Sequence, residues 1–224
     1  MSKLKPLKNA YTQEPYLLDT KTGHQYRRTV GAITWPSATA DDGERPGCVI
    51  VLAESLTLPN VVGAERRDVW RLDEHESYDA SELIETAQRF QADWLVRTWA
   101  TPMQDRRSYM LHDANDVLRK LRQPRMRYGD PIGWMGKGEG LLPFYHALIQ
   151  RRTLSEKSLH LGSPSGAADE VAALGPKDTM KPVAHFPSAA ALMFALAEID
   201  LHKMPEWKDR GGIKGAIADT VGGY

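Results

Sequence analysis

Two apolar, β-prone runs near the start of the chain, separated by a polar segment rich in turn residues, constrain the fold most. The first run covers residues 26–35 and the second covers residues 47–53, with Ser, Asp, Gly and Pro between them. β-Branched and aromatic residues favour strands, and such polar clusters favour turns. The pattern predicts two strands joined as a long hairpin. A third strand is predicted at residues 67–72, before a charged connector at residues 73–77.

The next segment carries the clearest helix signal. Asp79 and Glu82 have the spacing of a capping box, in which side chains bond the free backbone donors of a helix start. Apolar residues then recur along one helical face at Leu83, Ala87, Phe90 and Trp94. A β-prone run follows at residues 94–99. A strand that comes after a crossover helix is expected to pair in parallel with the sheet.

The second half is more helical in pattern. Apolar spacing predicts helices around residues 114–121 and 141–149, with a loop at residues 125–140 between them. A short strand is expected at residues 158–161, followed by an Ala-rich helix at residues 165–174 that Gly175 and Pro176 end. Pro187 then opens a longer helix whose apolar side extends to Ile199.

Length and patterning predict one domain with irregular ends. Residues 1–25 show no sustained period and are expected to form an extended arm. Residues 26–203 are expected to form the α/β domain, and the Gly-rich residues 204–224 a tail. No apolar stretch approaches the roughly 20 residues that span a bilayer, and the first residues lack the apolar core of a secretion signal. We therefore expect a cytoplasmic protein with no membrane partner.

Charge and cysteine content exclude some classes of site. The chain has 29 basic and 29 acidic side chains, so nucleic-acid binding would need a local patch rather than a global positive field. Cys48 is the only cysteine, which excludes an intramolecular disulfide and a Cys-rich zinc site. Its place in an apolar run indicates a small buried residue.

The order of predicted elements is similar to the ribonuclease H-like fold. Residues 30–36 resemble the first strand, with its proline-containing exit, in the nuclease domain of terminase large subunits from tailed phages. Residues 48–54 resemble the second strand, and residues 70–99 the third strand, crossover helix and fourth strand. Residues 144–160 resemble the following helix and strand, and residues 185–196 the last active-site helix. The resemblance implies a mixed sheet of about five strands with helices on both faces, in a protein of phage or prophage origin that acts in the host cell.

The resemblance fails at the catalytic positions. Two-metal nucleases of this fold need carboxylates on the first strand, near the end of the fourth and on the last helix, because hard oxygen ligands hold the Mg²⁺ ions. The matching positions here are Thr34 or Trp35, Arg97 or Thr98, and Ser188. A cationic Arg97 would repel a metal ion. The resemblance therefore implies a non-catalytic domain without a cofactor, which binds DNA or terminase and other packaging proteins.

Two alternatives remain open. The chain could be an active Mg²⁺- or Mn²⁺-dependent nuclease whose carboxylates lie elsewhere, at Asp41, Asp42, Glu54 and Asp73, with Asp105 and Asp113 as further candidates. Turn acids of this kind are more often simply solvated. The chain could instead be a protein-interaction module with no nucleic-acid role.

One basic stretch is the best candidate for contact with nucleic acid or a partner. Its cations are Arg106, Arg107, Arg119, Lys120, Arg122, Arg125 and Arg127. Trp134 and Lys137 follow in a Gly-rich loop at residues 133–140, which lacks the Gly-Lys-Ser/Thr ending of a phosphate-binding loop. Several cations on one face could neutralise phosphates, and an aromatic ring could stack on a base. Basic residues on an amphipathic helix are also commonly a solvated face paired with nearby acids.

Overall fold

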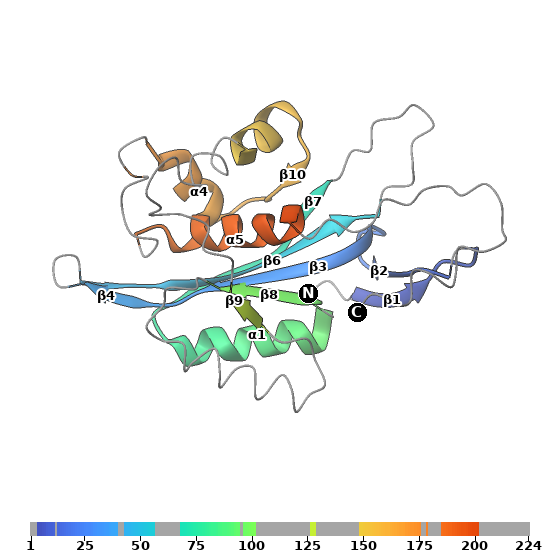
Figure 1. The fold of residues 1–224 in the computed structure, drawn as a ribbon, viewed down its shortest axis with the longest axis horizontal. Helices are drawn as coiled ribbons and strands as arrows, with labels where there is room; N and C mark the ends of the chain where they lie inside the picture. Colours follow the sequence, from blue (N-terminus) through green and yellow to red (C-terminus); the bar gives the residue numbers. More distant parts are fainter. Residues whose placement is uncertain are drawn as a thin grey trace.

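A mixed β-sheet runs through the centre of the molecule, with helices on both of its faces (Figure 1). The computed structural model describes residues 4–11, 13–39, 43–56, 68–94, 96–101, 126–128, 148–175, 178 and 185–201. The strands of the main sheet are β1 (Leu4–Lys8), β2 (Pro15–Asp19), β3 (Gln25–Thr34), β6 (Gly47–Ser55), β7 (Val69–Ser77), β8 (Thr98–Thr101), β9 (Met126–Tyr128) and β10 (Leu159–His160). A small second sheet pairs β4 (Ser37–Thr39) with β5 (Gly43–Arg45). The helices are α1 (Ala80–Trp94), the π-helical turn η1 (Arg151–Ser155), α4 (Gly166–Ala173) and α5 (Pro187–Leu201).

Strand β3 is the centre of this sheet. It pairs antiparallel with β6, which in turn pairs antiparallel with β7. On its other side β3 pairs in parallel with β8, and β8 pairs in parallel with β9. The order across this part of the sheet is therefore β7-β6-β3-β8-β9. Strand β10 adds in parallel outside β7, and the β1–β2 hairpin pairs with the beginning of β3.

Strands β3 and β6 are apolar because helices cover both faces of the sheet. On one face, Ile33 and Val51 lie in a buried cluster with Leu83 and Phe90 of α1. On the other face, Val30 and Ile50 belong to the cluster that contains α5. Such two-sided burial explains why these strands lack a simple polar–apolar alternation.

Helix α5 is apolar all round because it lies between the sheet and α4. Its described side chains, at residues 188–199, are all buried. It packs on β3 and β6 from above, and α4 packs on its outer side (Figure 1). A helix that is hydrophobic on every side is expected in the core of a protein. None of the described helices is long and apolar enough to cross a lipid bilayer.

The α/β class, the mixed sheet and the helices on both faces are confirmed. The antiparallel β3–β6 hairpin and the parallel fourth strand also form as predicted. Helix α1 extends to Trp94, so the fourth strand begins at Thr98 instead of residue 94. A short strand, β9, lies inside the predicted loop at residues 125–140. The helix predicted at residues 114–121 and the tail at residues 204–224 lie outside the described residues.

The sheet is larger than the five strands predicted, because it has eight in the described part of the chain. The N-terminal segment, expected as an extended arm, contributes two of them. Leu17 and Leu18 of β2 pair with Tyr26 and Gln25 of β3, along an edge that β8 leaves free. Leu4 and Leu17 are buried in the α1-side cluster, so this segment is fixed by packing as well as by backbone bonds.

Candidate functional site

The end of β3 meets the beginning of α5 at a polar junction under α4. The hydroxyl of Thr34 donates to the carbonyl oxygen of Pro187 at 3.0 Å and accepts from the backbone N–H of Cys48 at 3.0 Å. The next residue of α5, Ser188, donates its hydroxyl to Oε1 of Glu76 on β7. Two of the positions that the sequence singled out, Thr34 and Ser188, therefore lie at one place. Both carry neutral hydroxyls that are already hydrogen-bonded.

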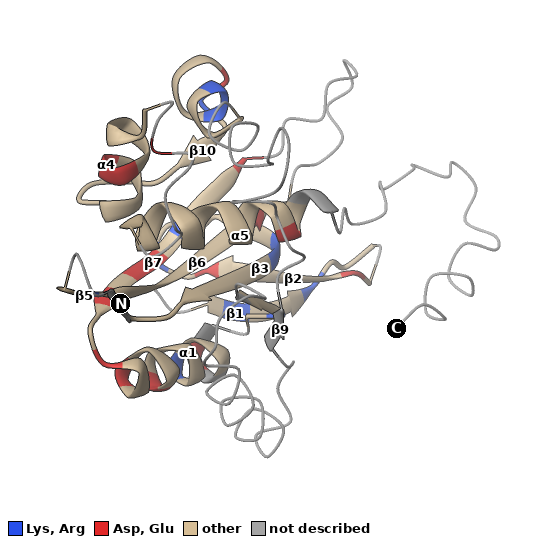
Figure 2. Cartoon of the chain, turned by 60° about the vertical axis from the view of Figure 1, so that its left-hand side comes forward, with Lys and Arg blue, Asp and Glu red and all other residues tan. Residues whose placement is uncertain are grey.

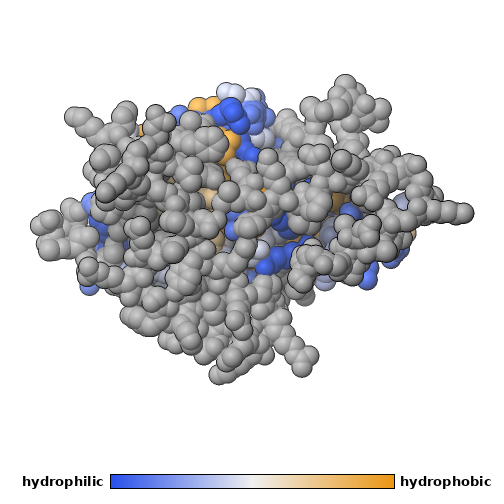
Figure 3. All heavy atoms as spheres, viewed as in Figure 1, coloured by the Kyte–Doolittle hydropathy of each residue, from blue (hydrophilic) through white to orange (hydrophobic). Residues whose placement is uncertain are grey.

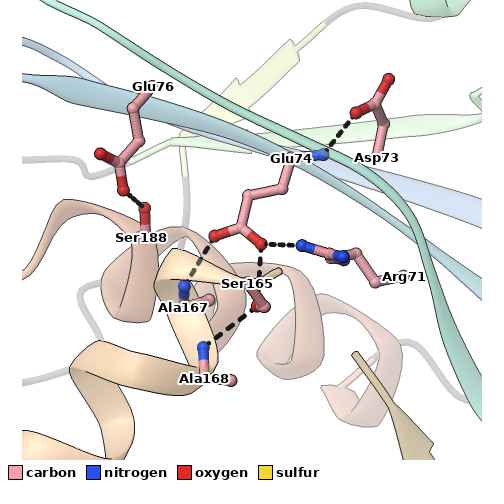
Figure 4. A network of polar contacts seen from close by, with 8 residues as sticks. All are labelled: Arg71, Asp73, Glu74, Glu76, Ser165, Ala167, Ala168 and Ser188. Carbon is pink, nitrogen blue, oxygen red and sulfur yellow. Dashed lines mark hydrogen bonds and ion pairs between the residues drawn. The ribbon is translucent and has the colours of Figure 1, made fainter. Parts of the chain in front are cut away.

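Glu74 of β7 binds the N-terminus of α4 (Figure 4). Its Oε1 accepts from the backbone N–H of Ala167 at 2.6 Å. Its Oε2 accepts from the hydroxyl of Ser165 at 2.9 Å and pairs with the guanidinium of Arg71. Ser165 is the N-cap residue of α4, and its hydroxyl accepts from Ala168 N–H at 3.1 Å. A carboxylate at this place satisfies free helix donors and interacts favourably with the helix dipole.

Glu170 of α4 likewise accepts a backbone hydrogen bond at the N-terminus of α5. Its Oε2 accepts from the backbone N–H of Ala189 at 2.7 Å. The pKa of the Glu170 carboxyl is raised to about 7, chiefly by burial and in smaller part by the negative charges of Glu76 and Glu74, against the opposing effect of backbone hydrogen bonds from Ala189 and Ser188. Near neutral pH this carboxyl therefore exists in both protonated and ionised forms.

Gly166 allows these groups to come close together. A Cβ at this position would lie 2.7 Å from Oε1 of Glu76 and 3.3 Å from Oε1 of Glu74, so both oxygens lie directly against the glycine. We call Glu74, Glu76 and Glu170, with Arg71, Ser165 and Ser188, the carboxylate junction. A hollow of about 260 Å³ opens beside it, lined by Arg71, Glu74, Glu76, Pro164 and Gly166.

A β-bulge in β7 orients the junction. Val51 pairs with Asp73 but its neighbour Leu52 pairs with Arg71, so β7 has one extra residue at this point. Beyond the bulge, Glu74 and Glu76 point toward α4 and α5, whereas His75 contacts Glu82 of α1 on the opposite face. Figure 4 shows Asp73 pointing away from Glu74, on the far side of the strand. Bulges commonly re-aim side chains in this way.

The remaining positions matched to lost carboxylates lie elsewhere. Trp35 is buried in the α1-side cluster. The backbone N–H of Arg97 donates to the carbonyl oxygen of Thr29, and Thr98 is opposite Val30 in the register of β8 and β3. Thr34 lies four positions after Val30 on β3, which is roughly 13 Å along a strand. Thr34 and Ser188 are thus brought together, and Arg97 and Thr98 are not brought to them.

The alternative metal ligands within the described residues do not converge. Glu54 is buried and pairs with Arg28, with Nε and Oε2 at 2.7 Å. Asp73 accepts from the backbone N–H of Glu74 at 2.8 Å. In the register of β6 and β7, Glu54 is opposite Val69, and Asp73 is opposite Val51. Glu54 and Asp73 are therefore offset by roughly 10 Å along the strands. Asp41, Asp42, Asp105 and Asp113 lie outside the described residues.

The basic stretch lies almost entirely outside the described residues. Only the backbone of Arg127 is described, in β9. Arg106, Arg107, Arg119, Lys120, Arg122, Arg125, Trp134 and Lys137 lie outside the described residues. Within the described part, Asp and Glu residues are frequent on β7, α4 and α1 (Figure 2).

Exposed large apolar residues are scattered. Among the described residues they are Tyr11, Tyr78 and Leu154, on three separate segments. The described surface visible in Figure 3 is largely hydrophilic, with a small hydrophobic patch near the top of the view. Single exposed apolar residues are ordinary on protein surfaces and do not mark an interface.

Searches with the sequence found no matching protein-family model and no matching curated protein.

Sequence reasoning missed the three glutamates of the junction. It ended the third strand at residue 72 and treated residues 73–77 as a connector, but β7 continues to Ser77. Glu74 and Glu76 are two residues apart, which places them on one face of a strand. That spacing indicates that the strand continues, but the polar composition of residues 73–77 favoured a connector instead.

Proposed function

We propose that this chain is a ribonuclease H-like domain, related to the nuclease domain of phage terminase large subunits, that binds DNA or packaging proteins without cutting DNA. The observation that carries the proposal is the strand order β7-β6-β3-β8-β9, with β8 and β9 parallel to the central strand. Helix α1 crosses from β7 to β8 on one face, and α5 lies on the other face (Figure 1). The antiparallel order β7-β6-β3 with β8 parallel to β3 agrees with the first four strands that the resemblance implies, whereas β10, the strand matched next in the chain, pairs outside β7.

The chemistry at the end of the central strand supports a non-catalytic role. In active relatives a carboxylate is expected there, because it must hold a metal ion beside the phosphate. Thr34 and Ser188 instead carry neutral hydroxyls, engaged with Pro187 and Glu76. The nearby Glu74 and Glu170 use oxygens to accept from the N-termini of α4 and α5, so they act as helix caps. The proposed domain thus keeps a fold in which the catalytic groups have been replaced.

The proposal predicts DNA retention without cleavage. Plasmid DNA incubated with the protein and Mn²⁺ should remain intact on an agarose gel, even at high protein concentration and after long exposure. Nicked or linear plasmid would contradict the non-catalytic role and favour the alternative of an active nuclease with displaced carboxylates. Glu74→Gln, Glu76→Gln and Glu170→Gln would then show whether the junction supplies the ligands.

Binding is tested by charge reversal in the basic stretch. Arg119→Glu should weaken retention of duplex DNA. It should also reduce the slope of log binding constant against log salt concentration by about one, because one phosphate contact is lost. Arg151→Glu is the matched control, since Arg151, at the start of η1, is exposed and pairs with Glu156, just after its end. Equal effects of both changes would indicate non-specific electrostatics. Absence of retention at low salt would direct the search to a protein partner.

A further inference from the structure

We propose that one proton in the carboxylate junction locks α4 onto α5 and β7 at mildly acidic pH, and that its release on approach to neutral pH loosens α4. The inference is independent of the proposed function, because it concerns how three elements hold together and not what the domain binds.

The charges at the junction leave an excess of negative charge. Glu74 and Glu76 both lie against Gly166, and Glu76 and Glu170 accept from the adjacent residues Ser188 and Ala189. Among the described residues, Arg71 is the one cation that forms an ion pair with any of the three. The N-termini of α4 and α5 each supply the equivalent of about half a positive charge. Together these offset about two of the three negative charges. Binding of one proton neutralises the one negative charge that remains.

The proton is expected on Glu170. Glu74 accepts three hydrogen bonds, one of them from Arg71, so its oxygens are already engaged. Glu76 accepts from Ser188. Glu170 has no ion pair among the described residues, and its bonds come from the backbone at the start of α5. Its pKa of about 7 agrees with this assignment.

Other titratable groups lie on the elements packed around the junction. From β6, Cys48 faces the junction, and burial raises the pKa of its thiol well above the ordinary value, with Glu74, Glu76 and Glu170 adding to the rise. It therefore remains neutral. On α4, Asp169 is exposed, and Asp178 accepts from Gly175 N–H beyond the helix. His185 is the titratable residue on the segment just before α5.

The direction of the effect follows from linkage. A carboxyl whose pKa is raised in the folded state favours folding in its protonated form. Its contribution is complete below the ordinary pKa near 4.5, falls as pH rises, and is lost above about 7. When Glu170 ionises, its charge faces those of Glu76 and Glu74. Because Glu170 belongs to α4, the strain is relieved by movement of α4 away from β7 and α5.

Hydrogen–deuterium exchange of the α4 amides tests the proposal in the intact chain. After correction for intrinsic rates, protection in the wild-type protein should fall by up to about tenfold per pH unit between pH 5.5 and 7 and then level off, as release of one proton requires. Glu170→Gln keeps an acceptor for Ala189 N–H and cannot ionise, so its protection should change less than about twofold over this range. Asp169→Asn, an uncharged replacement on the same helix, should behave as the wild type.

A second variant separates charge repulsion from a general loss of packing. Glu76→Gln removes one of the facing charges, so the fall in protection should shift to lower pH. Flat protection in the wild-type protein between pH 5.5 and 7.5 would overturn the proposal without any variant. An unchanged pH dependence in Glu170→Gln would overturn it equally, because the proton would then reside elsewhere.

Discussion

At Gly47, at the start of β6, the absence of a side chain allows the end of β3 to lie close to β6. A Cβ there would lie 2.3 Å from the carbonyl oxygen of Thr34 and 2.8 Å from the nitrogen of Pro36, which are both backbone atoms. We expect Gly47→Ala to lower the free energy of unfolding by about 1–3 kcal/mol, since the backbone must shift to admit one methyl group. Urea denaturation measures this loss.

Gly175→Ala provides the matched control. The nearest atom to a Cβ at that position is Asp178 Oδ2 at 3.5 Å, an ordinary contact. The control should therefore change stability by less than about 0.5 kcal/mol. If both variants unfolded at the same urea concentration, the close packing of Thr34 against β6 would be in doubt. The sequence predicts a strand starting near Gly47, but this approach depends on tertiary structure and could not be predicted from local pattern.

At the scale of elements, α5 is held to the sheet at both ends. Its N-terminus donates to Glu170 and Glu76 through Ala189 and Ser188. Near its C-terminus, the carbonyl oxygen of Ile199 accepts from Nη2 of Arg28 at 2.6 Å. The Glu76 carboxyl at the start and the Arg28 guanidinium at the end both complement the helix dipole. The pattern of apolar residues predicted this helix, but not the charged residues that fix it, because those come from β3, β7 and α4.

The buried Arg28–Glu54 pair allows this anchoring to be tested. Glu54→Leu removes a carboxylate from a guanidinium that is itself buried, and we expect a loss of about 3–5 kcal/mol in the free energy of unfolding. The double variant Arg28→Met/Glu54→Leu should be more stable than Glu54→Leu alone, because no buried charge remains. A double-mutant cycle by chemical denaturation measures the coupling. Strictly additive losses would show that the two charges act independently.

Element boundaries mark where sequence reasoning succeeds and where it stops. The capping signal at Asp79 correctly predicted the start of α1, and Asp79 Oδ1 accepts from Ser81 N–H at 2.8 Å. In a capping box, Glu82 would accept directly from the backbone N–H of Asp79; here the hydroxyl of Ser77 lies between the two groups. Glu82 accepts from the hydroxyl of Ser77 at 2.5 Å, and Ser77 accepts from Asp79 N–H at 3.0 Å. Local chemistry thus fixes a helix start, whereas the partner that completes the cap depends on the end of β7.

At the scale of the whole molecule, the sequence predicted the layers but not the extent of the sheet. The central strands are recognisable because helices cover both of their faces and make them continuously apolar. The β1–β2 hairpin has a weaker signal. Strand β1 carries Lys5, Pro6 and Lys8, a composition typical of an edge strand that avoids further pairing. The same residues that protect this edge gave the segment the pattern of an extended arm outside the sheet.

Leu17 decides whether this hairpin is part of the cooperative core or an appendage. It is buried beside Tyr26 in the α1-side cluster, so Leu17→Ala should lower the free energy of unfolding by about 2–5 kcal/mol. Leu18→Ala, on the opposite face and only half buried, is the control and should cost less. If the hairpin is integral, tryptophan fluorescence and circular dichroism will report one coincident transition in urea, shifted to lower concentration. An early transition that leaves the tryptophan signal unchanged would instead mean that the hairpin unfolds separately, and that the stable unit begins at β3.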